Sequence, residues 1–175
     1  MLYSETFIHE QPTLAMVFSP YALAILFSLT SAALTGSGKS TRNWNCCKPS
    51  CAWEGKANVT SPVAVCNKDN APLDDLSATS ACDNGTAYGC ADQAPWQVDN
   101  ATAYGYSGVV ITGKTESDWC CTCFELTFTS GPAQGRKMTI QAVDTLPDTG
   151  VNQFSLLVHT ASGSIDVTRS SADRE

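Results

Sequence analysis

The sequence has little positive charge. Its 175 residues include ten Lys and Arg against seventeen Asp and Glu, which gives a formal net charge of −7 at pH 7. A chain with this balance does not attract polyanions, so nucleic acid is excluded as an expected partner and a neutral polymer stays open. No Lys or Arg precedes Lys39, so the basic segment that usually opens a secretory signal peptide is missing.

Long apolar runs are also scarce. Residues 16–34 are mostly apolar and end in small residues, but Ser and Thr interrupt a run that is already short for a membrane span of about 20 residues. The pattern predicts a signal peptide over residues 16–33, cleaved after Ala33, and a mature chain without a membrane anchor. Residues 1–15 form an N-terminal extension that does not fit a signal peptide, and Met16 is an alternative start.

Cysteine, by contrast, is abundant. All nine cysteines lie within residues 46–123, a density typical of a disulfide framework made in an oxidising compartment. They fit bridges better than a zinc site, so we expect no metal and no organic cofactor. Three Asn-X-Thr sequons in polar stretches also favour secretion and predict glycosylation in exposed loops, at Asn58, Asn84 and Asn100.

Regular structure is predicted mainly in the second half of the chain. Residues 40–97 are rich in Cys, Pro, Asn and Gly, which indicates long loops with one short helix near 74–78. Beyond Asp99, four β-branched or alternating runs predict strands at 108–113, 125–131, 137–143 and 152–158. The sequence GPAQG between the second and third runs predicts a hairpin. In the third run, one face is shared by Met138, Ile140 and Ala142.

One motif is a chance match. Residues 33–40 read ALTGSGKS, a loose form of the phosphate-binding loop. Such a loop works between a strand and a helix, where backbone N–H groups cradle phosphates. Here it joins the end of the signal peptide to a cysteine doublet, so we expect no nucleotide site.

Four stretches carry a resemblance to a known family. Residues 40–53 read STRNWNCCKPSCAW, which resembles the signature STRYWDCCKPSCxW of glycoside hydrolase family 45, the small secreted endo-β-1,4-glucanases. The resemblance continues in YGCADQAPWQVDN at 88–100, DWCCTCFELTFTSGPAQGRKM at 118–138 and DTGVNQFSL at 148–156. It covers residues 38–158, a partial catalytic domain, and leaves 159–175 as a divergent tail of disordered composition.

The resemblance implies a fold and a set of cross-links. The fold is all-β, a six-stranded double-psi β-barrel with long disulfide-tied loops and an open groove for a glucan chain, and we expect a secreted monomer. The family's disulfides, carried over, pair Cys47 with Cys82, Cys51 with Cys120 and Cys66 with Cys90. In the family, the partners of the other three cysteines lie in the C-terminal part, after the region that resembles this chain. The resemblance therefore implies no partner for Cys46, Cys121 and Cys123.

The resemblance also places the chemistry. An inverting glycosidase needs one carboxylic acid to protonate the leaving oxygen and one carboxylate to activate water. The family's base position is Asn45 here, and its acid position is Ser155. Asp148 matches a third, supporting aspartate. The family's Tyr before the base and His before the acid are replaced by Asn43 and Gln153.

These replacements predict weak or absent hydrolysis. An amide is a poor proton acceptor and a serine hydroxyl is far too weak an acid, and each lost role costs on the order of 10²–10⁴ in rate. Nearby carboxylates exist, and we do not expect them to substitute: Asp144, Asp148 and Glu125. The signature retains substrate-binding candidates, and an aromatic one joins them: Thr41, Arg42, Trp44, Lys48 and Trp96.

Single residues of this set have ordinary structural interpretations too. Trp44 can pack against disulfides, Arg42 can be a solvated charge and Asp148 can be a turn residue after Pro147, and only the joint pattern favours a site. Three functions stay open: a slow endoglucanase for cellulose or soluble β-glucan, a non-hydrolytic glucan binder similar to expansins, and a secreted decoy for inhibitors of active relatives. Ser155 disfavours the second, since expansins resemble the family in keeping the acid.

Overall fold

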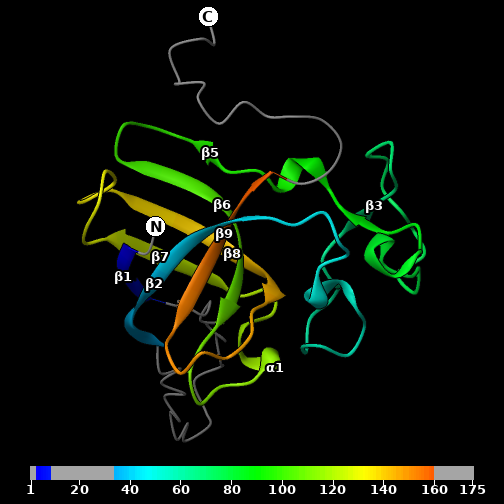
Figure 1. Cartoon of the computed structure of the whole chain (residues 1–175), viewed down its shortest axis with the longest axis horizontal. Coiled ribbons are helices and arrows are strands. Elements are labelled where there is room, and N and C mark those ends of the chain that lie inside the picture. The colour runs from blue at the N-terminus through cyan, green and yellow to red at the C-terminus, as the bar shows by residue number, and fades with distance from the viewer. Residues whose placement is uncertain (1–2, 9–33, 160–175) are drawn as a thin grey trace, which may run out of the picture.

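The computed structural model describes residues 3–8 and 34–159, a part of the chain dominated by strands (Figure 1). The strands are β1 (Tyr3–Ile8), β2 (Thr35–Trp44), β3 (Val65–Cys66), β4 (Tyr88–Gly89), β5 (Trp96–Gln97), β6 (Thr102–Val110), β7 (Cys123–Phe128), β8 (Lys137–Thr145) and β9 (Gln153–His159). The helices are α1 (Glu116–Trp119) and the 3-10 turns η1 (Ser50–Ala52), η2 (Ala81–Asp83) and η3 (Ala91–Gln93). With helices this short, none in the described part can cross a bilayer.

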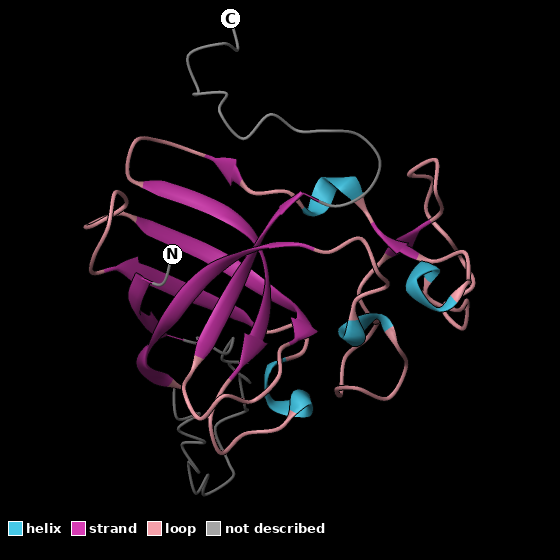
Figure 2. Ribbon diagram, in the orientation of Figure 1, coloured by secondary structure: helices cyan, strands magenta, loops and turns pink. Residues whose placement is uncertain are grey.

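The large sheet curls on itself (Figure 2), and the pairing of β6 with β9 closes six of its strands into a ring. β6 runs parallel to β8; β8, β7, β1 and β2 follow as antiparallel neighbours; β2 runs parallel to β9, and β9 returns antiparallel to β6. A closed ring leaves no unpaired sheet edge among its members. This confirms the predicted six-stranded barrel. The short β5 lies on the same edge of β6 as β9, further along the strand.

The barrel interior is filled by alternating side chains. In β7 and β8 every second residue is buried, and the predicted shared face of Met138, Ile140 and Ala142 is confirmed. Phe124 and Phe154, both fully buried, meet edge to face with ring centres 5.6 Å apart. Burying a side chain of this size stabilises a fold by about 1.5–3 kcal/mol, so the inward faces of these strands are a large part of what stabilises the barrel.

The predicted hairpin joins β7 to β8. Its register pairs Phe124 with Ile140 and Leu126 with Met138. Gly135 has φ +81° and its N–H donates to the carbonyl of Phe128 over 2.8 Å. A side chain is disfavoured at this φ, which explains the second glycine of GPAQG.

Two barrel strands were missing from the sequence prediction. β2 reads TGSGKSTRNW and has no apolar alternation, yet it fills the place between β1 and β9. Because residues 35–40 are strand, the ALTGSGKS motif does not form a phosphate-binding loop. β1 lies within the predicted N-terminal extension, 1–15. The predicted signal peptide, 16–33, lies outside the described residues, as does the predicted tail, 159–175, except for its first residue.

Residues 45–95, called the loop layer below, lie beside the barrel and contain mostly loops and 3-10 turns (Figure 1). The helix predicted near 74–78 is wrong, because the segment is a turn. The Asp75 carboxylate accepts hydrogen bonds from the Ser77 N–H at 2.9 Å and the Ser77 hydroxyl at 2.6 Å. Such local side-chain bonds compete with helix formation.

Candidate active site

Ser155, the acid position that the family resemblance implies, is fixed by strand pairing. Thr41 on β2 stands opposite Ser155 on β9, and the Thr41 hydroxyl donates to the Ser155 hydroxyl over 3.0 Å. Gln153 donates weakly to the same Thr41 oxygen at 3.4 Å. Ser155 is buried, at 6% exposed.

Gly108 on β6 connects Ser155 to a carboxylate. It pairs with Ser155 of β9 on one edge and with Asp144 of β8 on the other. Paired residues on neighbouring strands share a face, and a methyl group placed on Gly108 would lie 3.7 Å from Cβ of Asp144. Thr41, Ser155, Gly108 and Asp144 therefore form one line across four strands, called the four-strand row below.

A register shift puts Asp144 in this row. Along the β6–β8 pair, Ser107 faces Ala142 but Gly108 faces Asp144, so Val143 is an extra residue on β8. Ala142 and Val143 are both fully buried, and Asp144 is half-buried. A bulge of this kind re-aims the following side chain to the other face, and bulges are frequent beside active sites.

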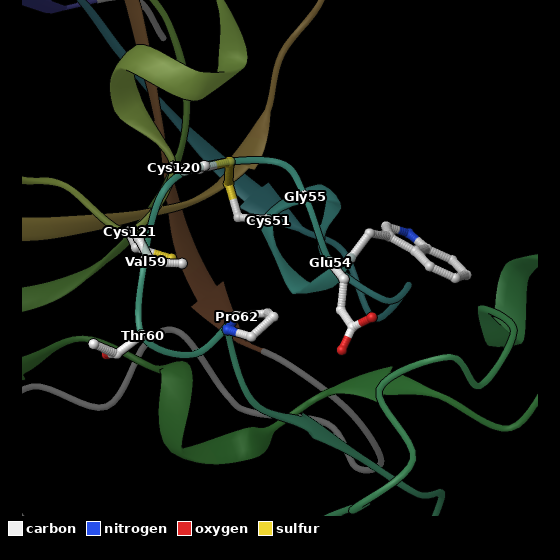
Figure 3. Close-up of a pocket in the computed structure, with 10 residues that line it drawn as sticks. Cys51, Glu54, Gly55, Val59, Thr60, Pro62, Cys120 and Cys121 are labelled. Carbon is white, nitrogen blue, oxygen red and sulfur yellow. A yellow bond between two sulfur atoms is a disulfide. The ribbon is translucent and has the colours of Figure 1, made fainter.

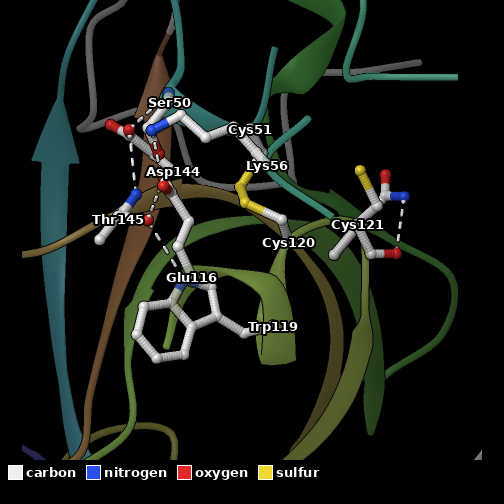
Figure 4. The surroundings of a disulfide bond; sticks show 10 residues. Ser50, Cys51, Lys56, Glu116, Trp119, Cys120, Cys121, Asp144 and Thr145 are labelled. Atoms are coloured by element: carbon white, nitrogen blue, oxygen red, sulfur yellow. Dashed lines mark hydrogen bonds and ion pairs between the residues drawn. A yellow bond between two sulfur atoms is a disulfide. The ribbon is translucent and has the colours of Figure 1, made fainter. Parts of the chain in front are cut away.

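Asn45 follows β2 directly and reaches the same carboxylate. Its Nδ2 donates to Oδ2 of Asp144 over 3.4 Å, and its Oδ1 accepts from the N–H of Cys47 at 3.0 Å. Oδ1 of Asp144 accepts from the N–H of Ser50 at 2.8 Å and from its neighbour Thr145 at 3.0 Å. Asp144 thus ties the start of η1 to the end of β8 (Figure 4). Its second oxygen accepts from Asn45.

A network beside Asp144 supports this end of β8 (Figure 4). The Thr145 hydroxyl donates to Glu116 at 2.8 Å and accepts from the Trp119 indole at 3.2 Å. Lys56 reaches the other Glu116 oxygen at 2.7 Å. Burial alone would raise the pKa of Glu116, but the hydrogen bonds from Lys56 and Thr145 outweigh it and hold the pKa below its ordinary value.

The predicted substrate-binding residues separate into exposed and buried groups. Trp44 is 60% exposed and Arg42 is exposed on the same strand. Trp96 is 47% exposed and stacks on Tyr104, with ring centres 5.6 Å apart and planes 19° from parallel. The sequence did not predict Tyr104 as a binding residue. The signal that could have found it is an aromatic residue close in sequence to Trp96.

Lys48 is the buried member. Its ammonium donates to the carbonyls of Leu76 and Ala78 and lies 3.3 Å from the ring centre of Trp53. Burial lowers its pKa. These contacts hold the loop at 76–78 in place, and a contact of Lys48 with glucan stays a prediction.

Asp148 is exposed and lies in the turn before β9. Its Oδ1 accepts from the N–H of Gly150 at 2.8 Å. No hydrogen bond in the described residues joins its side chain to Asn45 or Ser155. The supporting catalytic role implied by the family therefore stays a prediction, and the contact fits the turn residue that the sequence also allowed.

Three disulfides connect the loop layer, and their pairing is the one implied by the family resemblance: Cys47–Cys82, Cys51–Cys120 and Cys66–Cys90. Outside these bridges, Cys46 carries an exposed thiol, and burial raises the pKa of the half-buried Cys121 thiol. The sulfurs of Cys51 and Cys120 also approach Glu116, but a disulfide offers no thiolate to a metal. All three sequon asparagines are exposed, and their glycosylation stays a prediction.

A pocket of about 250 Å³ lies against the Cys51–Cys120 bridge (Figure 3). Its walls include Trp53, Glu54, Val59 and Cys121. None of its lining residues belongs to the four-strand row. The residues of the candidate chemistry therefore do not line this pocket.

Comparison with known proteins defines the class, that of the glycoside hydrolases. The model of glycosyl hydrolase family 45 matches residues 37–171, and the chain belongs to this family. It is 40% identical over 136 residues to an endoglucanase of Cryptopygus antarcticus, which covers 78% of this chain and 60% of that protein. It is 44% identical over 137 residues to a Fusarium oxysporum protein classed with type K endoglucanases, 78% of this chain and 36% of that one.

The fold agrees with the family. The crystal structure of the cellulase from the Antarctic springtail Cryptopygus antarcticus superimposes with a TM-score of 0.65 at 42% sequence identity. The superposition covers 67% of this chain and 56% of that one. The predicted double-psi β-barrel is thereby confirmed. The chain spans less than two thirds of the length of these relatives.

Proposed function

We propose that this chain is a secreted domain that binds β-1,4-glucan and hydrolyses it slowly because it lacks the family's general acid. The observation that carries the proposal is Ser155, which stands on β9 at the position where the resemblance implies the acid and accepts a hydrogen bond from Thr41. A hydroxyl cannot protonate a leaving sugar oxygen at neutral pH. The rate on natural glucan should fall by about 10²–10⁴ from this loss alone.

The exposed aromatic side chains support binding. Trp44 at the end of β2, and Trp96 with Tyr104 on the edge of β6, offer flat apolar faces with polar rims. Rings of this kind pack against the apolar faces of sugars while the surrounding polar groups bind hydroxyls. A neutral glucan also suits a chain of net negative charge.

Secretion is supported by the three disulfides and by the apolar segment at 16–33. The exposed sequons agree with passage through a compartment where glycans are added. A monomer with no cofactor is the simplest state for such a domain. These points are parts of the same proposal.

The test measures reducing-sugar release from a soluble β-glucan together with a cellulose pull-down. Ser155→Asp should raise the rate by about 10²–10⁴. The matched control Ser155→Asn should not, because asparagine has the size of aspartate but cannot donate an acidic proton. Trp44→Ala should weaken the pull-down. Rapid hydrolysis by the natural protein, with no gain in Ser155→Asp, would contradict the assignment of the acid. Failure of every variant to bind glucan would favour a decoy instead.

A further inference from the structure

Asp144 is a carboxylate within the four-strand row to which the family resemblance gives no role. Its Oδ1 is occupied by two backbone N–H groups, from Ser50 and Thr145. Among the described residues, the one hydrogen bond to Oδ2 is the long contact of 3.4 Å from Asn45. The second oxygen is therefore held in position without being fully engaged.

The pair Asn45 and Asp144 is complementary. The resemblance implies a carboxylate at 45, where this chain has an amide, and the structure has a carboxylate one hydrogen bond away at 144. An aspartate at 45 would face Asp144 at this short distance, and two like charges so close cannot both ionise easily. The amide at 45 removes that conflict and donates to Asp144.

The backbone spacing between Asp144 and Ser155 is close to the carboxyl spacing of an inverting pair. Asp144 and Ser155 each pair with Gly108, so their Cα atoms are two strand spacings apart, roughly 9–10 Å. Inverting glycosidases place their two carboxyl groups about 6.5–9.5 Å apart to leave room for water and the sugar. Gly108 itself places no side chain between the two positions, and the Leu146 side chain packs over it, with its Cδ2 2.9 Å from where a methyl group on Gly108 would lie.

We propose that Asp144 is the general base of this chain and that Asn45 orients it. The inference rests on the proposed function, since it assigns a role at the same glucan site. The chain has then lost only the acid half of the machinery. Asp144 takes over the role that the family gives to a base at position 45. This is contrary to the expectation from the sequence that no neighbouring carboxylate would substitute.

The chemical step balances as follows. The Asp144 carboxylate takes one proton from a water molecule while the water oxygen forms a bond to the anomeric carbon. The bond from that carbon to the leaving oxygen breaks, and its electron pair stays on the leaving oxygen. Solvent water protonates that oxygen, and the hydroxide so formed takes the proton back from Asp144. The product has the inverted anomeric configuration.

This step depends strongly on the leaving group. A sugar oxygen leaves poorly without a proton, so Ser155 makes natural glucan a slow substrate. A 2,4-dinitrophenolate leaves without a proton, so an aryl cellotrioside bypasses the missing acid and needs only the base. The two substrates separate the role of Asp144 from that of Ser155.

A purely structural role for Asp144 predicts a different result. Asp144→Asn keeps an oxygen for the N–H groups of Ser50 and Thr145, so the fold should persist. Loss of a base lowers kcat, leaves KM and glucan binding nearly unchanged, and removes the acid limb of the pH profile. A structural defect would lower the melting temperature and binding together.

The experiment compares 2,4-dinitrophenyl β-cellotrioside hydrolysis by the natural protein, by Asp144→Asn and by the exposed control Asp74→Asn. We expect Asp144→Asn to lose 10²–10⁴-fold in kcat and Asp74→Asn to be unchanged. Ser155→Asp should hydrolyse soluble glucan without any change at Asn45. Proton NMR of the first product should show the inverted anomer.

Three outcomes would overturn the inference. The first is full aryl-glycoside activity in a folded Asp144→Asn, and the second is a natural protein that binds glucan but does not cleave the aryl substrate. The third needs no variant at 144, namely a Ser155→Asp protein that stays inactive until Asn45→Asp is added. Loss of glucan pull-down by all proteins would instead refute the proposed function.

Discussion

The barrel and the loop layer are ordered by different forces. The barrel has six paired strands around fully buried side chains such as Phe124 and Phe154. The loop layer has few paired residues, and disulfides together with side-chain bonds to the backbone hold it, as at Lys48 and Asp75. Asn45 stands where one region passes into the other. The site therefore depends on a rigid barrel for Ser155 and Asp144 and on cross-links for the chain after Asn45.

The largest effect should come from the barrel core. Phe154→Ala removes a fully buried ring and its edge-to-face partner, and should cost about 3–5 kcal/mol of unfolding free energy. The loop-layer control Val59→Ala, at a side chain 40% exposed, should change it by about 0.5 kcal/mol or less. Chemical denaturation measures both. Equal losses would show that the two regions do not differ as described.

A smaller and more local effect should follow loss of a bridge within the loop layer. The Cys66–Cys90 bridge spans 24 residues, and replacing both by Ser should cost about 3 kcal/mol by the loop-entropy relation. Hydrogen exchange should accelerate in the loop layer while β7 and β8 stay protected. If the barrel amides accelerate equally, the regions unfold as one unit and the comparison fails.

The smallest effect concerns the ion pair that joins the two regions. Lys56 belongs to the loop layer, and Glu116 bonds to Thr145 of β8. Because folding lowers the pKa of Glu116, its stabilisation is complete above the ordinary value of 4.5 and disappears as the pH falls through the folded value. Glu116→Gln should cost less than about 1 kcal/mol at neutral pH. Thermal melts of both proteins should converge as the pH falls below 4.5 and through the lowered pKa of Glu116, and a constant difference would contradict this sign.

The strands that sequence predicts best are those whose side chains alternate. The runs at 125–131 and 137–143 and the turn between them correspond to β7 and β8. β2 could not be predicted in this way, because TGSGKSTRNW fills a barrel position through backbone pairing and carries no apolar pattern. The helix predicted at 74–78 is a turn instead, because the Asp75 carboxylate accepts a local hydrogen bond from the Ser77 N–H that favours the turn.

The residues of the candidate site also differ in how far the sequence predicts them. The positions of Asn45 and Ser155 follow from a motif, so the resemblance alone places them. Asp144 depends on the extra residue Val143, which arises only when β8 is laid against β6. No local feature of the sequence records that register. Its contact with Asn45 joins residues 99 positions apart in the chain.

Whether the barrel keeps strand β1 depends on whether the chain is cleaved at the predicted point. It precedes the predicted cleavage point after Ala33, whereas the other five barrel strands follow it. Cleavage there would leave β2 and β7 facing each other across a slot roughly two strand spacings, or about 9–10 Å, wide. A slot of this kind accepts a donor strand. Removal of residues 1–33, as the sequence predicts, would leave a barrel that can bind an extended peptide between β2 and β7, from a second copy or from elsewhere in the same chain.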